Sequence, residues 1–319
     1  KTIHQFFPID FFYFSSKFLK YWKPTLAVFI DSEIWPSMYK ELEKKSIPLL
    51  LMNARITHKS FRRWKLFNQF TGNIFESIKI AFPSNSDTNK HLKKLNVKKI
   101  KNIGNLKFSE ISNKKNIKLP SSFLKSIKKR LILCASSTHP SEEKIIANIH
   151  SQLKKNINNL LTIIIPRHVQ RIRKINEEIK SLGLRTIIRS SNEKIKKETD
   201  IYLVDTYGET KKFFNISKVA FIGGSIVNHG GQNPIEPARF NINIIHGPNI
   251  DNFKDIYRLF DKKKTAFKIN NISELKKISF KLLKVKKTKK INLSDMGNLI
   301  LKKSEAEILK IFKDEIKKT

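Results

Sequence analysis

Short apolar runs alternate with amphipathic stretches along most of this chain, and this alternation restricts its fold more than any other feature. Residues 25–30 (TLAVFI) and 47–52 (IPLLLM) have the composition of buried strands, and residues 36–45 between them have the spacing of a helix. Strands that alternate with helices in this order form parallel sheets whose faces the helices cover. The sequence therefore predicts an α/β fold.

The alternation occurs in two series. The first continues with strands expected at 78–82 and 98–103 and with helices expected at 60–75 and 86–94. The second has strands expected at 130–135, 160–165, 200–204, 218–222 and 242–246, and helices expected at 141–154 and 170–182. Residues 109–118 between the series are polar and rich in lysine, which is typical of an interdomain linker. We therefore expect two Rossmann-like parallel-sheet domains, at residues 1–115 and 120–319, facing an interdomain cleft at the carboxyl ends of their strands.

The composition excludes several classes of protein. The 319 residues include 64 Lys and Arg against 27 Asp and Glu, a formal net charge of +37, which fits a protein that binds nucleic acid or an anionic membrane. The lysines are scattered along the chain, which also fits a bias toward A·T-rich codons. At 39% hydrophobic residues the chain can form full cores, which excludes wholesale disorder. The single cysteine, Cys134, excludes an intramolecular disulfide, and the apolar runs are too short to cross a bilayer.

The most specific segment is residues 221–237 (FIGGSIVNHGGQNPIEP), where a strand leads into two glycine pairs and then a helix. Asn233, Pro234 and Glu236 suit the N-cap, the first turn and the third position of that helix, as in a capping box. The alternative is a ligand site in which the helix N-terminus binds an anion and Glu236 accepts hydrogen bonds from a ribose. We favour the ligand site because capping alone does not require two glycine pairs, which let a backbone approach a ligand closely. The spacing is not GxGxxG, so a dinucleotide fingerprint is not supported.

Polar residues also follow two other strands of the second series. The segment 131–140 (LILCASSTHP) ends in hydroxyl groups and a histidine, which could cap the next helix or bind a phosphate or carboxylate. The segment 163–168 (IIIPRH) places Arg167 at a strand end, where a guanidinium can bind phosphate in a bidentate manner. In VDTYGE (204–209), Gly208 and Glu209 could contact a base or ribose, or form a plain turn.

The first series has comparable strand ends. In FIDSEIWP (29–36), Asp31 and Glu33 could chelate a metal, act as general acid or base, or form the acidic first turn of a helix. Asn53-Ala54-Arg55 follows the second strand and Gly104-Asn105-Leu106-Lys107 follows the fourth. Each signal is weak alone, but all fall at carboxyl ends of predicted strands, where α/β proteins bind ligands.

Taken in order, FIDSEIWP, NAR, GNLKF, SSTHPSEE, IPRH, DTYGE and GGSIVNHGGQNPIEP resemble the segments of the bacterial 3-deoxy-D-manno-octulosonic acid (Kdo) transferase family over nearly the whole chain. The resemblance implies the GT-B fold and a glycosyltransferase of lipopolysaccharide core synthesis. Such an enzyme transfers Kdo from CMP-Kdo to a lipid A precursor, lipid IVA, with inversion and without a metal or other cofactor. The resemblance further implies an anionic membrane surface as partner, no nucleic acid, and a location at the cytoplasmic face of the inner membrane.

The resemblance also assigns roles to residues by position. Pro166 and Arg167 would bind the CMP phosphate, and Glu33 and Lys107 would assist the transition state. The nucleotide would be surrounded by Tyr207, Gly208, Glu209, Asn233, Pro234, Ile235 and Glu236. Further donor or acceptor contacts would come from Asp31, Arg55, Ser137, Thr138, His139, Gly223, Gly224, Gly230 and Gly231. Asp31 stands where the family usually has Glu, and Tyr207 where Met is common.

The family's general base, a glutamate, and its membrane-associated N-terminus lie in a segment that would precede Lys1. We therefore expect this chain to be N-terminally incomplete, and to bind CMP without transferring Kdo by itself.

Two rival interpretations stay open. A basic nucleic-acid-binding α/β protein is favoured by the charge and by the aromatic-basic stretch 61–70 (FRRWKLFNQF), although its aromatic residues Phe61, Trp64 and Phe67 are better explained by packing in a core. A metal-dependent nucleotide-sugar enzyme would use Asp31 and Glu33.

Overall fold

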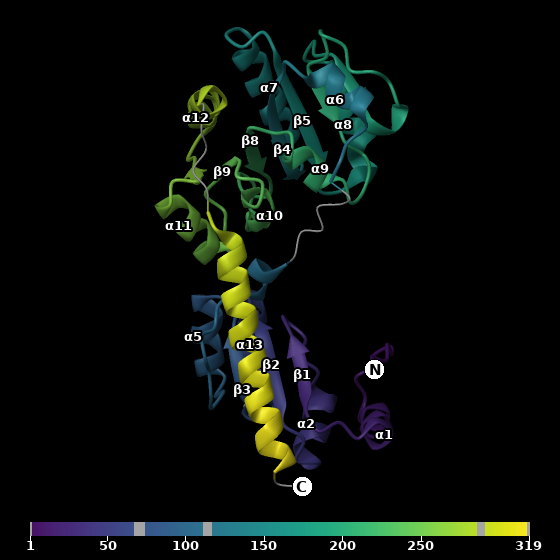
Figure 1. Cartoon of the computed structure of the whole chain (residues 1–319), viewed down its shortest axis with the longest axis vertical. Helices are drawn as coiled ribbons and strands as arrows, with labels where there is room; N and C mark the ends of the chain where they lie inside the picture. Colours follow the sequence, from purple (N-terminus) through teal and green to yellow (C-terminus); the bar gives the residue numbers. More distant parts are fainter. Residues whose placement is uncertain (1, 67–73, 111–116, 286–290, 318–319) are drawn as a thin grey trace. The chain divides into compact units, whose positions relative to one another are not determined.

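The computed structural model describes residues 2–66, 74–110, 117–285 and 291–317, and it divides into two compact units (Figure 1). The first unit contains Lys1–Glu110 together with Ser294–Thr319, and the second contains Ile111–Leu293. Each unit has a parallel sheet and surrounding helices, so the predicted α/β fold is confirmed. Among the described residues, no helix is both long and apolar enough to cross a membrane.

The first unit is built on a three-stranded sheet of order β1-β2-β3. Its strands are β1 (Ala27–Ile30), β2 (Leu49–Ala54) and β3 (Ile78–Pro83). Its helices are α1 (Phe12–Trp22), α2 (Pro36–Lys44), α3 (His58–Leu66), α5 (Ser86–Lys94), the 3-10 helix η1 (Leu106–Ser109) and α13 (Leu293–Ile316). The first three strands of the predicted series are therefore present, each shifted by at most two residues at either end.

Side chains of β2 alternate between two cores, because successive residues of a strand point to opposite faces. Leu49 and Leu51 belong to the core that includes Met38 of α2. Leu50 and Met52 belong to a second core that includes Ile311 of α13. All six residues of β2 are buried, as expected for a central strand that is covered on both faces.

The C-terminal helix is the main departure from the expected domain limits. Residues 294–319 fall in the predicted second domain of 120–319, yet α13 packs on the sheet of the first unit. Ion pairs between Lys79 and Glu315 and between Lys101 and Glu307 also tie α13 to that unit. The helix covers an apolar sheet face that would otherwise be exposed to water.

The prediction of a fourth strand at 98–103 is wrong. In this segment only Ile100 forms an isolated parallel bridge, to Ala81. Three of the six residues are lysines, and their ammonium groups require solvent, so the segment does not extend the buried sheet.

Helix α3 covers only part of the helix expected at 60–75, of which residues 67–73 lie outside the described structure. Phe61 is buried and stacks on the His91 ring at a centroid distance of 4.4 Å. Trp64 packs edge-on against Phe75. The core interpretation is thus confirmed for Phe61 and Trp64, while Phe67 is outside the described residues.

The second unit has a seven-stranded parallel sheet of order β10-β9-β8-β4-β5-β7-β6. Its strands are β4 (Leu131–Thr138), β5 (Leu160–Pro166), β6 (Thr186–Ile188), β7 (Ile201–Leu203), β8 (Val219–Ile222), β9 (Asn243–His246) and β10 (Ala266–Lys268). The five strands predicted from the sequence are the five central ones. The two edge strands, β6 and β10, were not predicted, and each is only three residues long.

Helices surround this sheet. They are α6 (Ser121–Ile127), α7 (Glu142–Lys154), α8 (Ile172–Lys180), α9 (Thr210–Phe214), α10 (Ile235–Ala238), α11 (Lys254–Lys262) and α12 (Ile272–Lys284), with 3-10 helices η3 (Val169–Arg171) and η4 (Arg189–Ser191). Ile146 of α7, Ile175 of α8 and Leu275 of α12 share one core with the sheet residues Leu133 and Phe221. Cys134 lies in the sheet, fully buried, and burial raises the pKa of its thiol to about 12. It is therefore a packing residue and not a reactive thiol.

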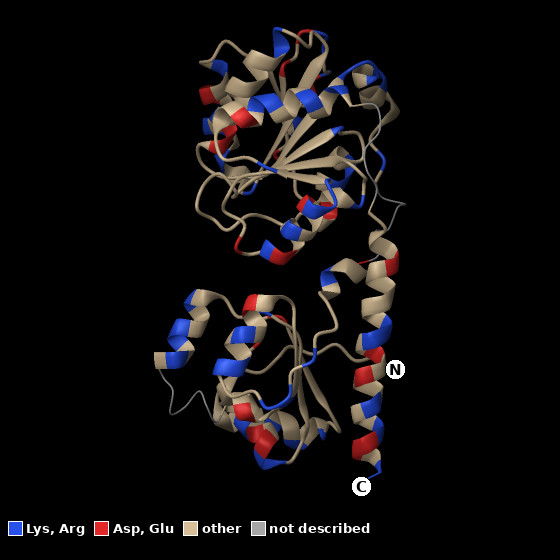
Figure 2. Cartoon of the chain, turned by 90° about the vertical axis from the view of Figure 1, so that its left-hand side faces the viewer, with Lys and Arg blue, Asp and Glu red and all other residues tan. Residues whose placement is uncertain are grey.

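Lysine and arginine residues are distributed over the helices and loops of both units and do not gather on one element (Figure 2). The scatter seen in the sequence is thus retained in the fold, and the net charge alone does not mark a binding surface.

Candidate active site

The candidate site lies at the carboxyl end of the sheet in the second unit, where the loops after β4, β5 and β8 meet. The chain runs from β4 to β5, β6 and β7 on one side of β4 and then crosses to β8, β9 and β10 on its other side, so the strand order reverses at β4. Ligands of open α/β sheets bind at such a switch point. The amide of Gly223 donates to the carbonyl oxygen of Ser136 (2.8 Å), and the amide of Arg167 donates to that of Thr138 (3.0 Å). These bonds join the three strand ends.

Gly223 is required here by close packing. A Cβ atom at this position would lie 2.4 Å from the carbonyl oxygen of Ser137, which is closer than van der Waals contact allows. Ser137 itself has a φ of +56° at an irregularity in the β4–β5 register. The first glycine pair therefore lets the end of β8 approach the end of β4.

Glu142, the first residue of α7, fixes the glycine-rich loop. Its buried carboxylate accepts hydrogen bonds from four backbone amides, those of His139 (2.9 Å), Gly224 (2.8 Å), Ser225 (3.2 Å) and Ile226 (3.0 Å). A buried carboxylate is stable only when its oxygens are saturated in this way. No role was assigned to Glu142 in the sequence analysis.

Glu143 has a second structural role beside it. This buried carboxylate accepts a hydrogen bond from the Thr138 hydroxyl (2.9 Å) and a bidentate pair from Arg171 (2.9 and 3.2 Å). Thr138 was expected to contact a ligand, but it is fully buried and its hydroxyl is used by Glu143. The signal in the sequence is the pair Glu142-Glu143 placed directly after a strand-to-helix loop.

Pro166 and Arg167, the expected phosphate-binding pair, end β5 at this site. Pro166 is buried and lies in register with Thr138, whereas Arg167 is exposed. The guanidinium of Arg167 has no partner among the residues that the structure describes. A cation fixed by its backbone at a strand end and open to solvent suits the binding of a phosphate.

Tyr207 to Glu209 form the loop between β7 and α9. Tyr207 is 69% exposed and Gly208 has a φ of +77°. The carboxylate of Glu209 pairs with Arg189 (3.0 Å) and Lys212 (2.9 Å). Partial burial alone would raise the pKa of Glu209, but hydrogen bonds from Arg189, Lys212 and Thr206 lower it to about 2. Glu209 therefore braces its loop, and Tyr207 and Gly208 are the exposed groups.

The segment from Asn233 to Glu236 departs from the predicted capping box. Helix α10 begins at Ile235 with Pro234 as N-cap, and the Asn233 side chain accepts from the Ile235 amide, two residues on (3.0 Å). This is an Asx turn that leads into a helix of four residues. The prediction that a helix starts at Asn233 is therefore wrong. Glu236 lies within 3.8 Å of the Lys211 ammonium on α9.

The second glycine pair also has a structural cause. Gly230 has a φ of +74°, and a Cβ atom there would lie 2.6 Å from the Asn252 amide nitrogen. That nitrogen donates to the carbonyl oxygens of His229 (2.9 Å) and Gly231 (3.3 Å). These hydrogen bonds attach the loop to the segment before α11. The argument that two glycine pairs have no structural reason is thus contradicted by the structure.

Three imidazoles meet beside these loops. The His139 ring, buried after β4, stacks on the His229 ring at a centroid distance of 4.1 Å and an angle of 18°. The His168 ring lies edge-on to His139 at 6.2 Å. Sequence reasoning singled out only His139, since the three residues come from loops far apart in the chain.

In the first unit, the ends of β1 and β2 and the helix η1 are joined through Asn53. Its side-chain amide donates to the Asp31 carboxylate (2.5 Å), and its oxygen accepts from the Leu106 amide (3.0 Å). The Arg55 amide donates to the Asp31 carbonyl oxygen (2.9 Å). The structure therefore brings together three of the expected strand ends, with Lys107 next along the chain in η1.

Glu33 is exposed and accepts a hydrogen bond from the Trp35 indole (2.8 Å). The side chains of Asp31 and Glu33 thus have different partners. No group of three or more His, Cys, Asp or Glu placed to hold a metal ion occurs among the described residues. The metal-dependent alternative gains no support from this geometry.

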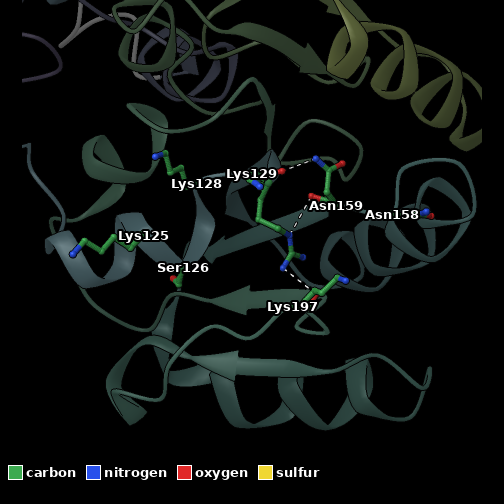
Figure 3. Close-up of a pocket in the computed structure, with 8 residues that line it drawn as sticks. Lys125, Ser126, Lys128, Lys129, Asn158, Asn159 and Lys197 are labelled. Atoms are coloured by element: carbon green, nitrogen blue, oxygen red, sulfur yellow. Dashed lines mark hydrogen bonds between the residues drawn. The ribbon is translucent and has the colours of Figure 1, made fainter.

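A separate pocket of about 600 Å³ lies where β4 and β5 begin in the second unit (Figure 3). Lys125 and Lys128 lie on one side of it and Asn158 on the other. Arg130 braces it by donating to several backbone carbonyl oxygens, including those of Leu160 (2.5 Å) and Thr199 (2.7 Å). No residue that the sequence analysis selected lines this pocket.

Several known proteins are similar to this chain in sequence or in fold. Residues 1–110 match the model of a family described as 3-deoxy-D-manno-octulosonic-acid transferase (kdotransferase). A 3-deoxy-D-manno-octulosonic acid transferase of Rickettsia felis is 36% identical over 275 residues, which are 86% of this chain and 59% of that relative. The C-terminal CMP-Kdo binding domain of WaaA from Acinetobacter baumannii is 25% identical, with a TM-score of 0.50, and covers 57% of this chain and 94% of its own. A glycosyltransferase from Rickettsia africae has a TM-score of 0.59 at 17% identity, over 95% of this chain and 80% of that one.

The fold is accordingly that of the GT-B glycosyltransferases, as the sequence predicted. The resemblance drawn from the motifs is confirmed, because residues 1–110 match the Kdo transferase family model and 86% of the chain is similar to a 3-deoxy-D-manno-octulosonic acid transferase. It spans 59% of the length of the Rickettsia felis relative.

Proposed function

We propose that this chain is the donor-binding and acceptor-binding portion of an enzyme that transfers Kdo from CMP-Kdo to lipid IVA in lipopolysaccharide synthesis. The observation that carries the proposal is the site at the β4, β5 and β8 ends, with the exposed Arg167 at its edge. Its support is the likeness of the second unit to a CMP-Kdo binding domain and the match of residues 1–110 to the family model.

On the donor side, Arg167 binds the phosphate of CMP-Kdo and stabilises the charge that develops on CMP as it leaves. Tyr207, Gly208 and Glu236 contact the nucleoside. Glu142 and Glu143 hold the surrounding loops in place, so the glycine-rich loop and the loop after β5 are positioned before the donor binds.

On the acceptor side, the joined strand ends of the first unit hold Glu33 and Lys107. A hydroxyl oxygen of the acceptor forms a bond to the anomeric carbon of Kdo while the bond to the CMP phosphate oxygen breaks on the opposite face, which inverts the configuration. Glu33 and Lys107 stabilise charge in that transition state, and the hydroxyl proton passes to a base outside residues 1–319. No metal or other cofactor is needed for this displacement.

The acceptor is a lipid, so we place the protein against the anionic surface at the cytoplasmic face of the inner membrane. The N-terminal segment supports this placement. Phe6, Ile9 and Tyr21 are 77% to 85% exposed, with Phe11 and Tyr13 near 60%. Aromatic side chains of this kind insert at a membrane interface, and neighbouring lysines of α1 suit anionic headgroups.

The nucleic-acid-binding alternative loses the support of its aromatic stretch, because Phe61 and Trp64 pack against the core of the first unit. A calorimetric titration of the chain with CMP, and with a single-stranded RNA in rising salt, separates the two functions. We expect saturable 1:1 binding of CMP. RNA binding that falls steeply with salt, together with no CMP binding, would favour the alternative.

A further inference from the structure

The three imidazoles beside the donor site differ in exposure. His139 is 7% exposed, and its ring packs against the His229 ring and against Gly224, where a Cβ atom would come within 3.2 Å of its Cδ2. His168 and His229 are exposed. Their ring nitrogens have no hydrogen-bond partner among the residues described by the structure. An anion that arrives from solvent would therefore meet His168 and His229, with His139 packed behind them.

The charges around the cluster are mostly positive. From the loop after β5, Arg167 and His168 face it, and Arg171 of η3 lies beyond them. The loop after β8 contributes His229 and the neutral Gln232, whose amide lies 3.3 Å from His139 Nε2. The two acids of α7 are already used, since Glu142 binds four amides and Glu143 binds Arg171.

His139 is consequently neutral at pH 7 when no anion is bound. Burial, and after it the neighbouring His229, His168, Arg167 and Arg171, lower its pKa to about 4. An anion in the cluster would oppose the effect of these cations and raise the pKa of His139, so binding would draw a proton from solvent.

A CMP ester of an octulosonic acid carries two negative charges, one on its phosphate diester and one on its carboxylate. Arg167 supplies one positive charge at the strand ends, because the charge of Arg171 is balanced by Glu143. A protonated imidazole would supply the second.

We propose that His168 and His229 bind the carboxylate of the donor sugar, with His139 as a positioning residue, and that binding is coupled to the uptake of one proton by this cluster. The proposal rests on the proposed function, because the carboxylate belongs to the donor named there. CMP lacks this carboxylate, so the cluster distinguishes the activated acidic sugar from its nucleotide product.

The test compares freshly prepared CMP-Kdo with CMP in titrations of the whole chain and of H229Q, H168Q and H139Q, with H58Q on α3 of the first unit as control. We expect H229Q and H168Q to weaken CMP-Kdo binding about tenfold and to change CMP binding less than twofold. The proposal would be overturned if these variants bound both ligands equally more weakly, or if neither affinity changed.

The pH profile tests the positioning role of His139. Neither anionic group of CMP-Kdo titrates between pH 6 and 8, whereas the phosphate of CMP has a second pKa of about 6 and gains charge over this range. In the unaltered chain we expect the affinity for CMP-Kdo to fall as the pH rises from 6 to 8, by up to about tenfold per pH unit. In H139Q/H229Q we expect this affinity not to change with pH. Binding enthalpies measured in two buffers with different ionisation enthalpies would give the number of protons taken up on binding.

A flat profile in the unaltered chain would contradict the coupled protonation. If the unaltered chain binds neither ligand, the proposed function itself fails. If it binds both and the histidine variants match H58Q, only the carboxylate site fails.

Discussion

At the scale of single residues, the site is held by groups that do not face a ligand. Glu142 and Glu143 are almost completely buried, and together they bind amides or side chains from the loops after β4 and β8 and from η3. The motif SSTHPSEE predicted a polar strand end, and the structure bears out its position. The structural roles of Glu142 and Glu143 could not be predicted, because they depend also on Arg171 and on the loop after β8, which lie 28 to 84 residues away in the chain.

Arg167 gives the first prediction. Arg167→Ala and Glu236→Ala should each weaken CMP binding by about 1–3 kcal/mol, the range for a lost hydrogen bond to a charged group. Isothermal titration calorimetry measures the change. Arg173→Ala removes an exposed arginine of α8 and serves as the matched control. CMP affinities of R167A and E236A equal to that of R173A would place the nucleotide elsewhere.

The second prediction concerns Gly223. In Gly223→Ala the new methyl group would lie 2.4 Å from a backbone oxygen, so the unfolding free energy should fall by about 3 kcal/mol, the upper end for overpacking. Gly183 has a φ of +76° and open space around it, so Gly183→Ala should cost only about 1 kcal/mol of backbone strain. Urea denaturation of both variants checks the difference. A smaller loss in G223A than in G183A would contradict the close packing of β8 on β4.

At the scale of elements, the alternating pattern predicted the central strands well because each is a continuous apolar run. The prediction failed for 98–103, where apolar residues are interrupted by lysines, and for β6 and β10, whose short apolar runs end at Arg189 and Lys268. The start of α10 was also mispredicted, because Asn233 can form an Asx turn as readily as an N-cap. Periodicity does not reveal which sheet a distant helix covers, and α13 illustrates this.

The packing of α13 can be tested through Ile311, which is 9% exposed in the core with Leu50 and Phe82. Ile311→Ala should lower the unfolding free energy of the first unit by about 2 kcal/mol, the low end for a buried isoleucine. Leu309, two residues away and 46% exposed, supplies the control Leu309→Ala, for which little change is expected. Chemical denaturation followed by circular dichroism measures both. Equal stability of the two variants would show that α13 does not contribute to that core.

At the scale of the whole molecule, the net charge of +37 is spread over both units and does not mark a binding site (Figure 2). The order of the motifs indicated the resemblance to Kdo transferases, and the comparisons confirm that resemblance. The sequence could not show how the motif residues are connected, since Asn53, Glu142 and Glu143 act through long-range hydrogen bonds.

The membrane placement predicts that the chain binds vesicles containing phosphatidylglycerol. Replacing Phe6 and Phe11 by serine should reduce binding severalfold, because less apolar surface enters the interface. Sedimentation with vesicles measures it, with Leu299→Ser on α13 as an exposed apolar control. If F6S/F11S and L299S bind equally well, the N-terminal segment is not the contact.

The central claim is that this chain contributes the donor and acceptor sites of a Kdo transferase. The most direct measurement is mass spectrometry of lipid IVA after incubation with CMP-Kdo. The chain is compared alone and completed with the residues of the Rickettsia felis relative that lie outside the match. We predict that the completed protein adds Kdo and that its R167A variant is strongly impaired, while the chain alone binds CMP without transfer. A completed, folded protein that leaves lipid IVA unmodified would contradict the account, and normal transfer by the chain alone would show that its base lies within residues 1–319.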